Sequence, residues 1–155
     1  MILDVDKPSI EMVDALLAEW KTDSAMDCLE PSNELRKIGS LHSKYLTILS
    51  THRRAFKRGE RTYLKLRRIK YEYYQGKLDQ DALTRYKWQP FPYSLKAGEI
   101  TTYLETDSDI LNAKKVLDIY EECMDVSERI LKELGSRTYQ LKDIVSWERF
   151  IAGVH

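Results

Sequence analysis

Apolar and aromatic residues recur along this chain mostly at intervals of three and four, which is the repeat of one face of an α-helix. The pattern predicts a short helix from about residue 8 to 21 and a much longer one from about residue 32 to 75. At 1.5 Å per residue the longer helix would extend about 65 Å, so we expect it to need a hairpin partner, other subunits, or both. Its alternating 3-4 spacing is typical of a coiled-coil seam. The seam positions are Leu35, Ile38, His42, Tyr45, Leu49, His52, Phe56, Tyr63, Leu66 and Tyr73.

The segment after the long helix is rich in turn residues and aromatic rings. Gly76 is expected to end the long helix, and Asp79 can cap a brief helix that runs to Tyr86. Residues 87–98 are expected to be irregular because prolines bracket Phe91 on both sides. The aromatic side chains here either pack against the end of a helical hairpin or form an exposed contact surface, and we favour packing.

The remaining residues predict one extended segment and two helices. Residues 100–104 alternate in polarity and are β-prone, so we expect an extended segment or a single edge strand. A capping-box-like pattern from Thr106 to Asp109 predicts a helix that ends at Leu134, since a glycine follows. A last helix is expected over about 138–152. The prediction is an all-α fold: a long helical hairpin with a short irregular or β-prone segment.

Charge is strongly segregated, although 25 Lys and Arg balance 25 Asp and Glu. Residues 53–70 hold nine bases and one acid, a net charge of +8. Residues 1–34 hold nine acids and two bases, and residues 99–134 hold ten acids and four bases. Such segregation predicts a local anion-binding patch, or a basic segment that pairs with an acidic one of the same or a neighbouring chain.

The basic segment ends in three tyrosines within four positions. Ammonium and guanidinium groups bind phosphates and flat rings stack on bases, so the combination fits a single nucleic-acid strand. The alternative is a solvated helix face that only keeps the protein soluble, and composition leaves both open. The candidate DNA-binding residues are Arg58, Arg61, Lys65, Arg67, Arg68, Lys70, Tyr73 and Tyr74.

No pattern in the sequence indicates catalysis, a cofactor or a metal site. There is no glycine-rich phosphate loop, and no serine lies in a nucleophile context. Asp107 and Asp109 are interpreted as helix caps rather than paired catalytic carboxylates. Cys28 and Cys123 are expected to be free thiols of a reduced, intracellular protein. We therefore expect a non-enzymatic protein without cofactors and without a membrane-spanning segment.

Five stretches occur in the order found in one protein family. They are Leu41-His42-Ser43-Lys44-Tyr45-Leu46; Arg68 to Gly76; Arg85-Tyr86; the spaced residues Thr102, Leu104, Asp107, Asp109, Ile110 and Leu111; and a tail with Ser136-Arg137, Ile144 and Phe150-x-Ala152-Gly153. The series resembles the UvsY family of recombination mediators of T-even-type (myovirus) bacteriophages, from about residue 30 onward. A longer acidic N-terminus and an insertion at residues 88–98 depart from the family pattern.

The resemblance implies a non-catalytic, single-stranded-DNA-binding mediator in homologous recombination, repair and recombination-dependent replication, in the cytoplasm of the infected bacterial host. The implied partners are single-stranded DNA, a phage RecA-like recombinase that the protein helps to load, and the phage single-strand-binding protein that covers the DNA. The family's DNA-contacting basic pair maps onto Arg68 and Lys70, with the order of Arg and Lys reversed.

The resemblance also implies a ring-like homo-oligomer, a heptamer in the family, to which the C-terminal helices contribute. We divide the chain into an acidic N-terminal extension with a short helix, residues 1–31, and a helical DNA-binding and oligomerisation domain, residues 32–155. The candidate oligomerisation residues are Val116, Tyr120, Cys123, Ile130, Leu134, Leu141, Ile144, Trp147, Phe150 and Ile151.

Two other classes of protein remain open. One is an oligomeric phage packaging or regulatory protein, which would prefer duplex DNA. The other is a coiled-coil scaffold whose basic stretch docks on acidic residues of a neighbour, such as Glu121, Glu122 and Glu128. Competition between single- and double-stranded oligonucleotides distinguishes the first, and a lack of nucleic-acid binding at low salt distinguishes the second.

Overall fold

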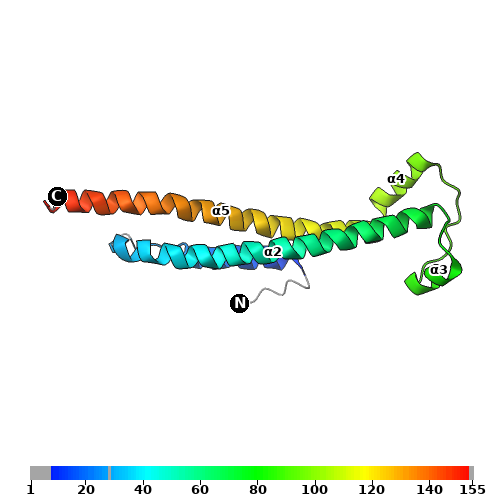
Figure 1. The fold of residues 1–155 in the computed structure, drawn as a ribbon, viewed down its shortest axis with the longest axis horizontal. Helices are drawn as coiled ribbons and strands as arrows, with labels where there is room; N and C mark the ends of the chain where they lie inside the picture. The colour runs from blue at the N-terminus through cyan, green and yellow to red at the C-terminus, as the bar shows by residue number, and fades with distance from the viewer. Residues whose placement is uncertain (1–7, 28, 154–155) are drawn as a thin grey trace. The chain divides into compact units, whose positions relative to one another are not determined.

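The computed structural model describes residues 8–27 and 29–153, and every regular element among them is an α-helix (Figure 1). The all-α fold predicted from the sequence is confirmed. No helix within the described ranges is long and apolar enough to cross a membrane. Cys28 lies outside the described residues. The helices are α1 (Ile10–Asp23), α2 (Pro31–Tyr74), α3 (Gln80–Tyr86), α4 (Ala97–Thr106) and α5 (Ser108–Ile151).

The chain forms two compact units. The first combines the residues up to 55 with those from 119 onward, so it holds α1, the start of α2 and most of α5. The second comprises residues 56–118 and holds the rest of α2, the start of α5, and α3 and α4. The functional division at residue 31 that the charge distribution suggested stays a prediction.

In the first unit, α1 is fixed to α2 by apolar and charged contacts. Trp20 meets the buried ring of Tyr45 edge-on, with 5.4 Å between the ring centroids. The Lys44 ammonium lies 2.6 Å from carboxylate oxygens of both Glu19 and Asp23. Trp20 is therefore a packing residue in this unit. Side chains of α2 therefore keep the acidic N-terminal helix α1 in place within this unit.

The helix α5 continues through Gly135, so the break predicted after Leu134 is wrong. Leu134 and Leu141, two turns apart on one face, are both buried. Between them Arg137 donates to the carbonyl oxygen of Ser24 at 2.8 Å. A glycine inside a helix costs about 1 kcal/mol relative to alanine, and burial of two leucines outweighs that cost. Packing on both sides of Gly135 keeps the helix intact.

Residues 100–104 lie inside α4, so the predicted extended segment is also wrong. The Glu99 carboxylate accepts a hydrogen bond from the Lys96 amide at 2.7 Å, which stabilises the first turn. Ile100 and Leu104 stand one turn apart and are both 3% exposed, packed in one cluster with Tyr74. Burial of two positions with helical spacing overrides their β propensity.

The segment between α2 and α4 follows the prediction up to residue 96, and residues 97–98, predicted to be irregular, belong to α4. The Asp79 carboxylate accepts from the Ala82 amide at 2.7 Å and caps α3. Residues 87–96 contain no regular element. The Phe91 ring packs against Tyr73 and Tyr74, with ring centroids 5.8 and 5.0 Å away, which confirms the packing interpretation for this ring.

His52 is a buried polar residue of the first unit. Its side chain is fully enclosed and its Nδ1 lies 2.9 Å from the carbonyl oxygen of Ile48, whereas Nε2 has no hydrogen-bond partner among the described residues. Burial lowers the pKa of His52 below its ordinary value of 6.5, and the Ile48 carbonyl offsets only part of this shift. His42, the other seam histidine, is exposed.

We expect mild acid to destabilise the protein through His52. Its folded-state pKa is depressed, so its contribution to stability is fully present above pH 6.5 and is lost as the pH falls through the lowered pKa. In His52→Leu the free energy of unfolding should therefore change less between neutral and mildly acidic pH than in the wild type. Urea unfolding at both pH values measures this difference. An equal change in the two proteins would contradict the assignment.

Candidate nucleic-acid interface

A cationic face runs along the part of α2 that belongs to the second unit. It consists of Arg58, Arg61, Lys65 and Arg68, which follow one another at intervals of three and four and so share one side of the helix. All four side chains are exposed. Arg68 is 82% exposed and its Nε lies 3.2 Å from Glu72, an exposed pair worth only about 0.3–0.5 kcal/mol. Because this pair is weak, the Arg68 guanidinium can exchange Glu72 for a phosphate.

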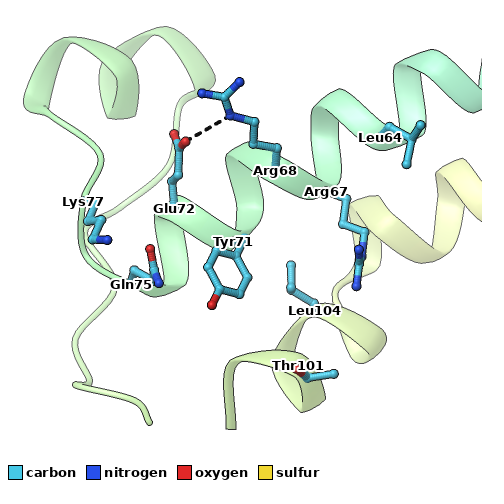
Figure 2. Close-up of a pocket in the computed structure, with 9 residues that line it drawn as sticks. All are labelled: Leu64, Arg67, Arg68, Tyr71, Glu72, Gln75, Lys77, Thr101 and Leu104. Carbon is cyan, nitrogen blue, oxygen red and sulfur yellow. Dashed lines mark hydrogen bonds and ion pairs between the residues drawn. The ribbon is translucent and has the colours of Figure 1, made fainter. Parts of the chain in front are cut away.

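Beside the cationic face lies a cleft of about 610 Å³. Figure 2 shows the Tyr71 ring projecting from α2 into the space in front of Thr101 and Leu104 of α4. Arg67 projects from α2 beside Leu104, and Gln75 and Lys77 lie on the opposite side of Tyr71. The cleft is lined by Leu64, Arg67, Arg68, Tyr71, Glu72, Gln75, Lys77, Thr101 and Leu104.

Of the three tyrosines after the basic segment, Tyr71 is the one that lines this cleft. The Tyr73 hydroxyl donates to the carbonyl oxygen of Gln89 at 2.8 Å, and its ring contacts Trp88 with 5.2 Å between centroids. Tyr74 is 9% exposed. The two rings predicted to stack on bases are thus already packed against other parts of the second unit.

Lys70 occupies the interior of the second unit. Its side chain is 6% exposed, with Nζ 3.0 Å from Asp107 and 2.7 Å from Asp109. The ammonium also lies over the Trp88 ring, 4.0 Å from the centroid. Burial lowers the pKa of Lys70, but its hydrogen bonds to Asp109 and Asp107 outweigh burial and raise it above 10.5. Lys70 is therefore charged and already paired with two carboxylates.

Asp107 joins this interior lysine to the start of α5. One carboxylate oxygen accepts from the Tyr74 hydroxyl at 2.6 Å, and the other accepts from the amides of Asp109 and Ile110 at 2.9 and 3.1 Å. Burial raises the pKa of Asp107, but the Tyr74 hydroxyl and the Lys70 ammonium outweigh it, so the pKa lies below 3.8. The same carboxylate raises the pKa of Tyr74, adding to the effect of burial.

The capping box predicted from Thr106 to Asp109 is wrong, because Asp107 caps α5 instead. The Thr106 hydroxyl donates back to the carbonyl oxygen of Thr102, at 3.0 Å, inside α4. The interpretation of Asp107 as a cap is confirmed. Its pairing with Lys70 was not visible in the sequence, since 37 positions separate the two residues.

The structure thus divides the candidate DNA-binding residues into two groups, and their contacts with DNA stay predictions. Members of one group have exposed side chains on α2; these are Arg58, Arg61, Lys65, Arg67 and Arg68. Members of the other group are packed inside the second unit; these are Lys70, Tyr73 and Tyr74. Tyr71 was missed, although Leu64, Arg67 and Tyr71 have the 3-4 spacing of one exposed helix face.

The candidate oligomerisation residues divide in a similar way. Val116 is half-buried, and the buried residues are Tyr120, Cys123, Ile130, Leu134 and Leu141. Burial raises the pKa of the Cys123 thiol to about 11. The exposed residues lie near the end of α5; these are Ile144, Trp147, Phe150 and Ile151. Among the candidate oligomerisation residues, this last group is the one that presents large apolar side chains to solvent.

An all-helical protein with an exposed cationic helix face and an aromatic cleft belongs to the class that can bind a polyanion such as a nucleic-acid strand. A family model described as "Recombination, repair and ssDNA binding protein UvsY" matches residues 19–154. The chain therefore belongs to the UvsY family. The match begins inside α1, whose first residues precede it.

Solved structures show the same fold. Crystal structures of the bacteriophage T4 recombination mediator protein UvsY in lattice types IV and II each align with a TM-score of 0.79 and 24% sequence identity. The alignments cover 89% and 90% of this chain and 98% and 96% of those chains. No curated protein sequence matches the chain.

Proposed function

We propose that this protein is a single-stranded-DNA-binding recombination mediator, and that DNA phosphates bind the cationic face of α2 together with Arg67. Membership of the UvsY family supports this role. The observation that carries the proposal is that the basic side chains of this face remain exposed. Few acidic residues lie near them in the sequence. One subunit offers few phosphate contacts, so useful affinity comes from several copies along one strand.

Binding by an oligomer imposes a path on the DNA, and we propose that this path is the basis of mediation. The phage single-strand-binding protein binds less tightly to a strand that is held on several cationic faces. Its dissociation from the DNA therefore becomes easier. The exposed DNA is then accessible to a phage RecA-like recombinase, which the protein helps to load. In this mechanism the protein acts by binding and not by catalysis, in the cytoplasm of the infected host.

Loading can be tested with DNA covered by single-strand-binding protein. Adding this protein should shorten the delay before the recombinase hydrolyses ATP on the covered strand. An Arg67→Ala, Arg68→Ala variant should leave the delay unchanged, because it no longer holds the DNA. If the variant shortens the delay as much as the wild type does, mediation does not depend on this face.

The rival reading as a duplex-binding packaging or regulatory protein is tested by competition. A labelled single strand bound to the wild-type protein is challenged with unlabelled single-stranded or duplex DNA of equal length. We expect the single strand to compete more strongly. Stronger competition by the duplex would favour the rival class, and no binding even at low salt would favour the coiled-coil scaffold.

Removing Arg67 and Arg68 should weaken single-strand binding in a salt-dependent way. For each lost phosphate contact, the slope of log K against log salt concentration should flatten by about 0.7. Fluorescence anisotropy at several salt concentrations measures this slope. The matched control is Arg129→Ala, whose side chain is 83% exposed and has an acid one turn away, as Arg68 does. An unchanged slope in the double variant, with the oligomer intact, would refute the assignment.

We further propose that the exposed residues at the end of α5 join copies of the chain into a ring-like homo-oligomer. Trp147 and Phe150 are each 62% exposed and stack on one another with 5.7 Å between their centroids. Ile151 is 68% exposed beside them. Contiguous apolar surface of this kind marks interaction sites. A heptamer is the candidate form, and light scattering measures the subunit number.

A further inference from the structure

We propose that the cleft beside Tyr71 holds one unstacked base of the bound strand, with the base ring on Tyr71 and the flanking phosphates on Arg67 and Lys77. This inference rests on the proposed function and deepens it, because it adds recognition of a base to recognition of phosphates. It assigns roles to Tyr71, Gln75 and Lys77.

The Tyr71 ring is free to receive a base. It is 36% exposed, and it takes part in no ring contact with another side chain in the described part of the chain. Tyr73 and Tyr74, by contrast, contact each other at 5.1 Å and pack in one cluster with Phe91. A free aromatic face in a cleft provides a stacking surface for any of the bases, since each base has a π-face.

The cleft has the size and polarity that a nucleotide needs. Its volume of about 610 Å³ lies within the usual range for small-molecule sites, about 300–1,000 Å³. Leu64 and Leu104 give it apolar walls, while the Thr101 hydroxyl and the Gln75 amide provide donors and acceptors for a base edge. The cleft can therefore take a base of either size without reading the sequence strictly.

The charges around the cleft favour an anion next to the base. Arg67, Arg68 and Lys77 are the cations of its lining, and Glu72 is the one carboxylate. That carboxylate is already paired with Arg68. Arg67 and Lys77 are exposed and form no ion pair with any residue that the structure describes. Two guanidinium or ammonium groups thus remain for the phosphates on either side of the stacked base.

The position of the cleft connects it to the rest of the strand. Arg68 belongs both to the cleft lining and to the cationic face of α2, so a strand lying along that face passes the cleft entrance. A base inside the cleft must leave the stack of its neighbours. Duplex DNA meets this condition only by unpairing, at a cost of a few kcal/mol. The cleft therefore gives selectivity for single strands that phosphate contacts alone do not supply.

The test compares a single strand with an abasic strand that has the same number of phosphates. In Tyr71→Ala, affinity for the base-containing strand should fall about 5- to 150-fold, the loss expected for one stacked base, while its salt slope stays as in wild type. Tyr71→Phe, the matched control, keeps the ring and should bind like wild type. Wild type and Tyr71→Ala should bind the abasic strand equally. A fluorescent adenine analogue in the strand should be quenched on binding wild type but not Tyr71→Ala.

Each of the other outcomes contradicts either the proposed function or this inference alone. If the wild-type protein binds no single strand, the proposed function fails. If it binds base-containing and abasic strands equally, and Tyr71→Ala leaves affinity and quenching unchanged, binding is to phosphates only and this inference fails while the proposed function stands. Should Tyr71→Ala not fold, the comparison of the two strands on wild-type protein alone still decides.

Discussion

Replacement of Lys70 by alanine is expected to lower the free energy of unfolding by about 3–5 kcal/mol, the usual cost of breaking a buried ion pair from one side. The variant leaves the Asp107 carboxylate inside the second unit without its cation. It also removes the ammonium from the Trp88 ring, 4.0 Å away. A buried charge without a partner is among the few causes of so large a loss from one substitution.

The loss should extend to the shape of the cleft beside Tyr71. Asp107 connects Lys70 and Tyr74 of α2 to the first turn of α5, directly after α4 ends. Leu104, near the end of α4, lines the cleft. We therefore interpret Lys70 as a positioning residue, and any fall in DNA affinity in Lys70→Ala should come with a fall in stability.

Two variants test this interpretation. Arg68→Ala, two positions earlier on the opposite side of the helix, should change stability by less than about 0.5 kcal/mol. Lys70→Met combined with Asp107→Asn should recover much of the stability, because the asparagine still caps α5 and its amide can donate to the Tyr74 hydroxyl. Denaturant unfolding measures all three. A Lys70→Ala protein as stable as wild type, but with a flatter salt slope for DNA, would show that Lys70 binds phosphate directly.

Disrupting the end of α5 is expected to lower single-strand affinity about 100- to 10,000-fold, the range over which linked binding sites exceed a single one. Trp147→Ser with Phe150→Ser removes the stacked rings that we place between subunits. Neither residue belongs to the second unit, which holds the cationic face. The expected loss is therefore one of avidity, and light scattering should show a smaller particle at the same concentration.

A matched control separates assembly from general loss of aromatic surface. Tyr93 is 65% exposed, close to the 62% of Trp147 and Phe150, and lies in the second unit. Tyr93→Ser should leave both particle size and affinity unchanged. Two results would contradict the prediction: a double variant that keeps its subunit number, or one that dissociates and still binds a long strand as tightly as wild type.

Much of the fold could be predicted because the apolar residues of its two long helices recur at the local 3-4 spacing of a helix face. The 3-4 pattern placed α2 within one residue at each end, and Asp79 marked the start of α3 correctly. The errors arose where tertiary packing opposed local preference. Residues 100–104 read as a strand but bury Ile100 and Leu104 as a helix, and Gly135 read as a stop but lies inside α5.

The candidate site was predictable only in part. An exposed basic face could be predicted because basic residues far outnumber the acidic residues near them in the sequence. Their side chains are exposed in the structure. An inward-facing lysine looks the same as an outward-facing one until its partners are known. Leu66, Lys70 and Tyr74 repeat every fourth residue, so Lys70 shares the buried side of Tyr74, while Arg68, two positions away, points elsewhere. The same offset separates Tyr71, at the cleft, from Tyr73.

Photochemical cross-linking tests the central claim most directly, namely that a single strand lies on the exposed cationic face of α2 and enters the cleft beside it. A strand with a photoreactive thymidine analogue is bound to the wild-type oligomer and irradiated, and mass spectrometry maps the linked peptides. We predict that the cross-links concentrate between Arg58 and Lys77, with Tyr71 the main site. Cross-links that fall instead on α1 or on the end of α5, with none on this stretch, would contradict the account.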